Sequence, residues 1–252
     1  MLEWLETPRP GPSDPSRSAG ALNRLIPPYL GLTNCVVRGQ AALIRCEKAI
    51  PLRISGRQCL FILSDSLLEA GGRETKPVEL DARIELVLKQ VTAILGGGLC
   101  RLSSDTLTPF QLDLVTDCKH SILYLTDANA ALIERRGVRD LAELEKHLYV
   151  RGRDNFYPGS DILLCVKGDP QTAVTYGFTS RNEGWYQEES PRFSLMWESL
   201  PSANLPLDRH LPSDYLLDQS ESKPALYDGG DTHAGVDASQ LPTISDAEPA
   251  QG

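Results

Sequence analysis

The chain has 252 residues, of which 41% are hydrophobic, and a formal net charge of −9. This acidic balance excludes broad electrostatic attraction to nucleic-acid phosphates or anionic lipid, so we expect neither direct nucleic-acid binding nor membrane coating. No apolar run is long enough to span a bilayer, and the first residues lack the basic start and apolar run of a secretory signal. We therefore expect a cytoplasmic, intracellular protein that is not exported by the Sec route.

A flexible arm is predicted over residues 1–20. Prolines recur there among serine, aspartate and glycine, and such a composition buries too little apolar surface to offset the entropy of ordering. Trp4 stands out in this arm, flanked by Leu2 and Leu5. It would either pack on the body of the protein or act as a short protein-binding element.

The body is predicted over residues 21–200, either as one unit or as a small β subdomain (21–70) and a helix-plus-sheet subdomain (77–200). Near its start, two segments, 35–46 and 52–63, each carry two apolar runs around a turn that contains glycine. This pattern is typical of β-hairpins. We expect the two hairpins to form a small antiparallel sheet.

The first of two predicted amphipathic helices spans residues 77–95. Its apolar residues recur at helical spacing, acidic residues occupy its early turns, and three glycines follow at 96–98. The apolar stripe consists of Leu80, Ile84, Val87, Leu88, Val91, Ile94 and Leu95. Because the glycines follow the helix rather than precede it, we interpret them as its C-cap and not as a phosphate-binding loop.

Residues 121–150 form the central unit of the predicted body. Residues 122–125 are apolar on both faces of an extended segment, which is typical of a fully covered strand, and a polar turn follows. The second amphipathic helix is predicted from Arg139 to Leu148.

A β-hairpin is predicted further along, where the apolar runs 162–166 and 172–178 flank a turn with glycine and proline. Together these elements predict the fold class α+β, with antiparallel sheets flanked by two amphipathic helices.

The phrase LTDANAALIERRG at residues 125–137, together with the order of the predicted elements, resembles sensor modules of the GAF and PAS type. In those modules a strand that ends in Thr-Asp turns into a second strand, as Thr126 and Asp127 would here. The chain lacks the Gly-Thr-Asn stretch of one GAF subgroup. The resemblance implies a ligand-sensing or dimerising domain, and no binding residue is transferred from it.

Residues 201–252 are predicted to be a disordered acidic tail. Nine acidic residues against two basic ones give this segment −7 of the net charge of −9, and no apolar periodicity is present. One apolar island, residues 211–217, interrupts it. The island would bind a protein partner or dock back on the body through Tyr215, Leu216 and Leu217.

Catalytic chemistry has one candidate pair in the sequence. Cys118 and His120 lie close together before the central strand, and a thiol with a nearby imidazole would suit a cysteine-dependent hydrolase. The alternative is a buried cysteine beside a surface histidine. The six cysteines lie mostly in apolar runs and never as C-x-x-C, which indicates reduced, buried thiols. Four scattered histidines lack zinc-site spacing, so we expect no metal and no cofactor.

The function that these observations favour is non-enzymatic. We expect a regulatory or adaptor protein that binds a protein partner or associates with itself, with the acidic tail tuning that contact. Three alternatives stay open: a viral structural or accessory protein of the matrix type, a GAF/PAS-like ligand sensor, and a cysteine-dependent hydrolase.

Overall fold

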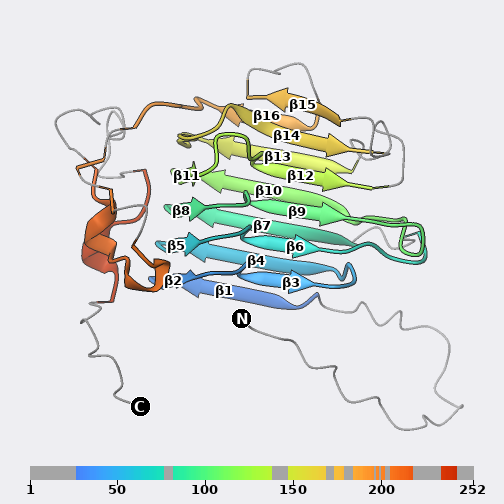
Figure 1. Ribbon diagram of the computed structural model, residues 1–252, viewed down its shortest axis with the longest axis horizontal. Coiled ribbons are helices and arrows are strands. Elements are labelled where there is room, and N and C mark those ends of the chain that lie inside the picture. The colour runs from blue at the N-terminus through green and yellow to red at the C-terminus, as the bar shows by residue number, and fades with distance from the viewer. Residues whose placement is uncertain are drawn as a thin grey trace, which may run out of the picture.

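The computed structural model describes residues 27–76, 82–137, 147–168, 173–178, 184–195, 197–198, 200–201, 205–217 and 234–242. Over these residues the chain winds through three sheets that are built almost entirely from parallel strands. Successive coils stack on one another along a single axis (Figure 1). This arrangement is a β-solenoid, and the predicted α+β class is wrong.

Each of the first four coils contributes one strand to each sheet. Sheet A consists of β1 (Tyr29–Thr33), β4 (Leu52–Arg57), β7 (Arg83–Lys89), β10 (Asp113–Lys119), β13 (Leu148–Arg153) and β16 (Tyr186–Glu189). Sheet B consists of β2 (Val36–Gly39), β5 (Leu60–Leu63), β8 (Thr92–Leu95) and β11 (Ile122–Leu125). Sheet C consists of β3 (Ile44–Cys46), β6 (Leu68–Ala70), β9 (Cys100–Ser103), β12 (Ile133–Arg136), β14 (Ile162–Lys167) and β15 (Ala173–Gly177).

The core is a set of stacked aliphatic columns inside the coils. Leu52, Ile84, Leu114 and Leu148 occupy one position of sheet A in four successive coils and are all buried, and they fall 32, 30 and 34 residues apart. Alternate strand residues point to opposite faces, so β7 buries every second side chain. Stacking thus gives each coil an interior that no single coil could bury alone.

One corner of the coil repeats in every turn. Between sheets A and B the chain places a single residue in the left-handed region, with φ from 50° to 56°. These corner residues are Asn34, Gln58, Gln90, His120, Asp154 and Ser190. The amides of the first five donate to the next coil, for example from Gln58 to the Lys89 carbonyl at 3.1 Å and from Gln90 to the Lys119 carbonyl at 3.0 Å. The corner is therefore held by the neighbouring coil as well as by its own residue.

Substitution of Gln90 tests the left-handed backbone conformation of this corner directly. At φ 52° a side chain is disfavoured, so Gln90→Gly should be more stable than Gln90→Ala by about 1 kcal/mol. In the helix predicted from the sequence the order would be reversed, because glycine costs about 1 kcal/mol relative to alanine inside a helix. Urea denaturation of the two variants measures the difference in stability. A more stable alanine variant would contradict the left-handed conformation of Gln90.

The helix predicted over residues 77–95 is wrong. Its residues 83–89 form β7 and its residues 92–95 form β8, with the corner at Gln90 between them. The side chains of β7 are alternately buried and more exposed, whereas those of β8 are buried on both faces. The combined apolar positions of the two strands therefore have the spacing of an apolar helix stripe. The triple glycine after it is the corner between sheets B and C and not a helix C-cap. The second predicted helix falls mostly on residues 138–146, outside the described residues, and Leu148 begins β13.

The two early hairpins are also wrong, whereas the late one is confirmed. β2 and β3 lie in different sheets, as do β4 and β5, so neither pair exchanges backbone hydrogen bonds. β14 and β15 pair antiparallel, with Val166 opposite Val174. The two strands on which the GAF/PAS resemblance rests do not pair either, because β11 lies in sheet B and β12 lies in sheet C. Among the described residues, no helix is long and apolar enough to cross a membrane.

Candidate interaction surface

Sheet B has two apolar faces, and only one of them faces the core of the coils. Phe61 and Leu63 of β5 point into the main core. Leu60 and Ile62 of the same strand, with Ile94 of β8, belong to a separate buried cluster on the other face. A strand that is apolar on both sides must be covered on both sides, so the outer face of sheet B also has to be shielded from water.

The cover is the protein's own C-terminal part. We call residues 205–217 and 234–242 the C-terminal strap; both segments lie beside sheet B, in orange and red in Figure 1. Tyr215 and Leu241 are buried against the outer face of sheet B, and Leu207 and Val236 are packed at its edge. Two pieces of the segment predicted to be a tail therefore complete the apolar cover of sheet B.

The second strap segment is also fixed by backbone hydrogen bonds. The amide of Val236 donates to Thr92 Oγ1 at 3.0 Å, and the amide of Asp237 donates to Gln58 Oε1 at 2.9 Å. The amide of Gly235 donates to the carbonyl oxygen of the corner residue His120 at 2.8 Å. Three consecutive amides thus donate to three neighbouring coils of the solenoid, which fixes the register between the strap and sheet B.

The first strap segment is built around Tyr215. Its hydroxyl lies 2.5 Å from Nδ1 of the buried His210, and His210 Nε2 lies 3.0 Å from the Leu205 carbonyl oxygen. The Arg38 guanidinium on β2 donates to the His210 carbonyl oxygen. Trp197 packs edge-on against the Tyr215 ring, with 6.0 Å between the ring centroids. Burial raises the pKa of Tyr215, so its hydroxyl stays protonated and available as a donor.

The predicted binding residues fall in different places. Tyr215 is the strap residue that is buried against sheet B, whereas the side chain of its neighbour Leu216 is 39% exposed. Leu217 forms an antiparallel bridge with Trp197 and packs beside β11. Trp4 lies outside the described residues. Sequence reasoning found the island but missed the surface beneath it, although the unbroken apolar run of β5 is a signal for a strand covered twice.

The candidate catalytic pair does not form a catalytic arrangement. Cys118 points into the core and is 3% exposed, and burial raises the pKa of its thiol well above the ordinary value. His120 occupies the corner, where Nδ1 lies 3.9 Å from a carboxylate oxygen of Asp154. Burial lowers the pKa of His120 despite that carboxylate. A nucleophilic cysteine needs an accessible thiolate, which this thiol lacks.

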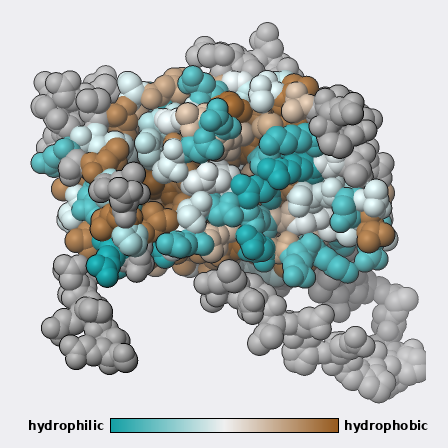
Figure 2. Space-filling view, in the orientation of Figure 1, coloured by the Kyte–Doolittle hydropathy of each residue, from teal (hydrophilic) through white to brown (hydrophobic). Residues whose placement is uncertain are grey.

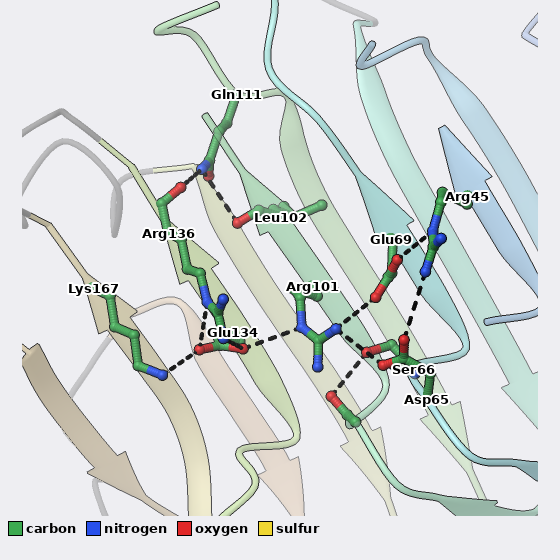
Figure 3. Close-up of polar contacts among 11 residues, drawn as sticks. Arg45, Asp65, Ser66, Glu69, Arg101, Leu102, Gln111, Glu134, Arg136 and Lys167 are labelled. Atoms are coloured by element: carbon green, nitrogen blue, oxygen red, sulfur yellow. Dashed lines mark hydrogen bonds and ion pairs between the residues drawn. The ribbon is translucent and has the colours of Figure 1, made fainter. Parts of the chain in front are cut away.

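The outer face of sheet C carries an alternating ladder of charges (Figure 3). Arg101 Nη1 lies 2.6 Å from Glu69 and 3.0 Å from Asp65, and its Nε lies 3.3 Å from Glu134. Glu134 in turn accepts from Arg136 and Lys167, whose hydrogen bonds hold its pKa below the ordinary range although burial opposes them. Figure 2 shows hydrophilic colour gathered over these strands. Since each charge has an opposite neighbour, the ladder stabilises the solvent face of the sheet.

Two ionisable groups lie inside the coils. Arg135 is fully buried, and its Nη2 donates to the Leu112 carbonyl oxygen at 2.9 Å; burial lowers its pKa to about 10, so it stays protonated at neutral pH. Glu188 of β16 places a buried carboxylate oxygen over Gly152, in space that only a glycine leaves open. Burial raises the pKa of Glu188 to about 7, against hydrogen bonds from Asn155 and Tyr157 that lower it.

Metal-binding clusters are absent from the described part of the chain, where no group of three or more His, Cys, Asp or Glu residues could hold an ion. No protein-family model, curated protein or solved structure matches this chain. The strapped outer face of sheet B is the best-defined candidate for an interaction surface in the described residues.

Proposed function

We propose that this β-solenoid is a non-enzymatic regulatory or adaptor protein that binds a protein partner on the outer face of sheet B. In this proposal the C-terminal strap is an intramolecular ligand for the same face. The observation that carries it is the cover itself: two short segments of the chain's own C-terminal part occupy an apolar surface formed by Leu60, Ile62 and Ile94. A binding partner would displace the strap from this surface or bind beside it on the same face.

The strap indicates the chemistry of that partner. It offers one aromatic side chain with a hydroxyl, Tyr215, and aliphatic residues on either side, and it uses backbone amides to reach Thr92 and Gln58. A partner that competes with it would be an extended peptide segment with an aromatic anchor and aliphatic neighbours. Because the strap is tethered to the body, its effective concentration is on the order of mM, so only a partner with better contacts would replace it.

Full-length Tyr215→Asp and Leu216→Asp variants test this role as a matched pair. Aspartate at the buried Tyr215 should release the strap, whereas aspartate at the 39% exposed Leu216 should leave it in place. We expect faster amide hydrogen exchange in β5 and β8 for the first variant alone. We also expect that variant to capture more of a specific protein from the native cell, with cross-links that map to sheet B.

Exchange in β7 is the folding control for this experiment, because that strand lies in sheet A and contributes no residue to the apolar cluster that the strap covers. Equal capture by the wild type and both variants, or cross-links that map only to other surfaces, would contradict the proposed binding face.

Self-association has separate support at the first coil. In the described part of the chain, β1, β2 and β3 each pair with one strand only, which leaves parallel edges free to pair with another chain. Tyr29 on β1 is 60% exposed. If the edges associate, Tyr29→Lys should lower the mass seen by light scattering at high protein concentration, since edge lysines oppose strand pairing. A mass that is unchanged by concentration in the wild type would rule this role out.

A further inference from the structure

Cys35 and Cys59 occupy the same position in the first two coils, directly after the corner residues Asn34 and Gln58. Two backbone hydrogen bonds enclose the pair: Asn34 N donates to the Arg57 carbonyl oxygen at 3.0 Å, and Leu60 N donates to the Cys35 carbonyl oxygen at 2.9 Å. The two cysteines are therefore immediate neighbours across the coils.

The separation of neighbouring coils suits a covalent bond between these residues. Paired strands lie about 4.8 Å apart, and Cα atoms joined by a disulfide are usually about 4.4 to 6.8 Å apart. Both thiols take the same orientation, with Cys35 Sγ donating to the Thr33 carbonyl oxygen at 3.1 Å and Cys59 Sγ donating to the Arg57 carbonyl oxygen at 3.2 Å. Rotation about one Cα–Cβ bond would turn one sulfur toward the other.

The other four cysteines have no such neighbour. In the registers of their strands, Cys46 faces Ala70, Cys100 faces Leu68 and Ile133, Cys118 faces Leu88 and Gly152, and Cys165 faces Glu134 and Thr175. All six cysteines are free thiols in the structure. Cys100 and Cys118 lie near each other across the core, but both are buried away from an external disulfide, whereas Cys35 and Cys59 share one position in neighbouring coils and Cys35 is partly exposed.

We propose that Cys35 and Cys59 form a redox-sensitive disulfide that joins the first coil to the second, by exchange with a low-molecular-weight disulfide such as oxidised glutathione. The Cys35 thiolate attacks one sulfur of glutathione disulfide and releases one glutathione, which takes up a proton. Cys59 then attacks the Cys35 sulfur of the mixed disulfide and releases the second glutathione. Two protein thiols are oxidised as one glutathione disulfide is reduced to two thiols.

The difference in burial sets this order. Cys35 is partly exposed, whereas Cys59 is fully buried, and burial raises the pKa of the Cys59 thiol. External disulfide should therefore meet Cys35 first, and Cys59 should act as the resolving thiol. The product would fasten the first coil, which has a strand neighbour on one side only in the described residues, and would slow its opening.

Serine variants allow a matched test in the full-length protein. Ser121 occupies the equivalent position two coils further on, where its hydroxyl donates to the Lys119 carbonyl oxygen at 3.0 Å. Serine at position 35 or 59 can reproduce the bond that each thiol makes now. Cys35→Ser, Cys59→Ser and the control Cys46→Ser should therefore all fold.

The experiment incubates each protein with oxidised glutathione, blocks free thiols and identifies tryptic peptides without reduction. Every cysteine falls in its own tryptic peptide, so each disulfide can be assigned. We expect a Cys35–Cys59 linked pair in the wild type and in Cys46→Ser, no linked pair in Cys35→Ser, and a Cys35 mixed disulfide with glutathione accumulating in Cys59→Ser. We also expect slower amide exchange in β1 and β2 after oxidation. A wild type that stays reduced, stops at the mixed disulfide or links other cysteines would overturn the proposal.

Discussion

Replacing Gly98 by alanine is expected to lower the free energy of unfolding by about 3 kcal/mol or more, because the new side chain meets backbone and the residue has a positive φ. Gly98 has φ 96°, and a Cβ there would lie 2.3 Å from the carbonyl oxygen of Ala131 in the next coil. Neither the glycine's own segment nor the stacked coil can move away without breaking the parallel register between β9 and β12.

Gly39 at the end of β2 provides the control, since a Cβ there meets nothing within 4 Å. Gly39→Ala should change the free energy of unfolding by less than about 0.5 kcal/mol. Chemical denaturation of both variants and the wild type measures the difference. Equal stability of the two alanine variants would show that the coils do not approach each other at Gly98 as closely as the structure has them.

Glu188→Gln is expected to remove a pH dependence from the stability of the protein. Because the pKa of Glu188 is raised from 4.5 to about 7 in the folded state, the folded protein binds this proton more tightly than the unfolded chain does. Its contribution is fully present below pH 4.5 and is lost as the pH rises through 7. The shift corresponds to a change of ~3 kcal/mol across that interval.

The wild type should therefore lose stability relative to Glu188→Gln between pH 5 and pH 8. The titratable groups beside the carboxyl are Tyr157, Cys118 and Asp154, and all three are present in both proteins. Glu189→Gln, which alters an exposed neighbour on the same strand, is the control and should shift the curve without changing its slope. Urea midpoints measured at intervals of pH give the slopes. Parallel curves for the wild type and Glu188→Gln would mean that the carboxyl is ionised in the folded protein.

The sequence predicted local structure correctly where the hydrophobic pattern comes from a single strand or from two strands joined by one turn. The apolar run at residues 122–125 is β11, and the hairpin of β14 and β15 is present, because its turn and both strands are adjacent in sequence. The helix prediction failed at residues 83–95 because two strands with different burial meet at Gln90. Periodicity measured across that corner mixes an alternating strand with one that is buried on both faces.

A repeat was present in the sequence and was missed. Gln58, Gln90 and His120 each precede a short apolar run, and each is a corner residue. Their spacings of 32 and 30 residues follow the length of a coil. The signal is weak because the corner requires only a tolerated positive φ and an inward-facing residue after it, so the residue types differ from coil to coil. The strapped face was hidden for another reason, since Tyr215 meets Leu60 only after the solenoid has formed.

Composition and hydropathy establish that the protein is acidic, that no apolar run is long enough to span a membrane, and where many strands and turns lie. The pairing of the strands and its direction follow from the folded coils. The burial pattern of an alternating strand shows which side chains are buried but not which neighbouring strand covers them. The neighbours here come from the next coil, 24 to 36 residues away. The same limit applies to the interaction surface, because its apolar residues and the strap that covers them are brought together by the stacked coils.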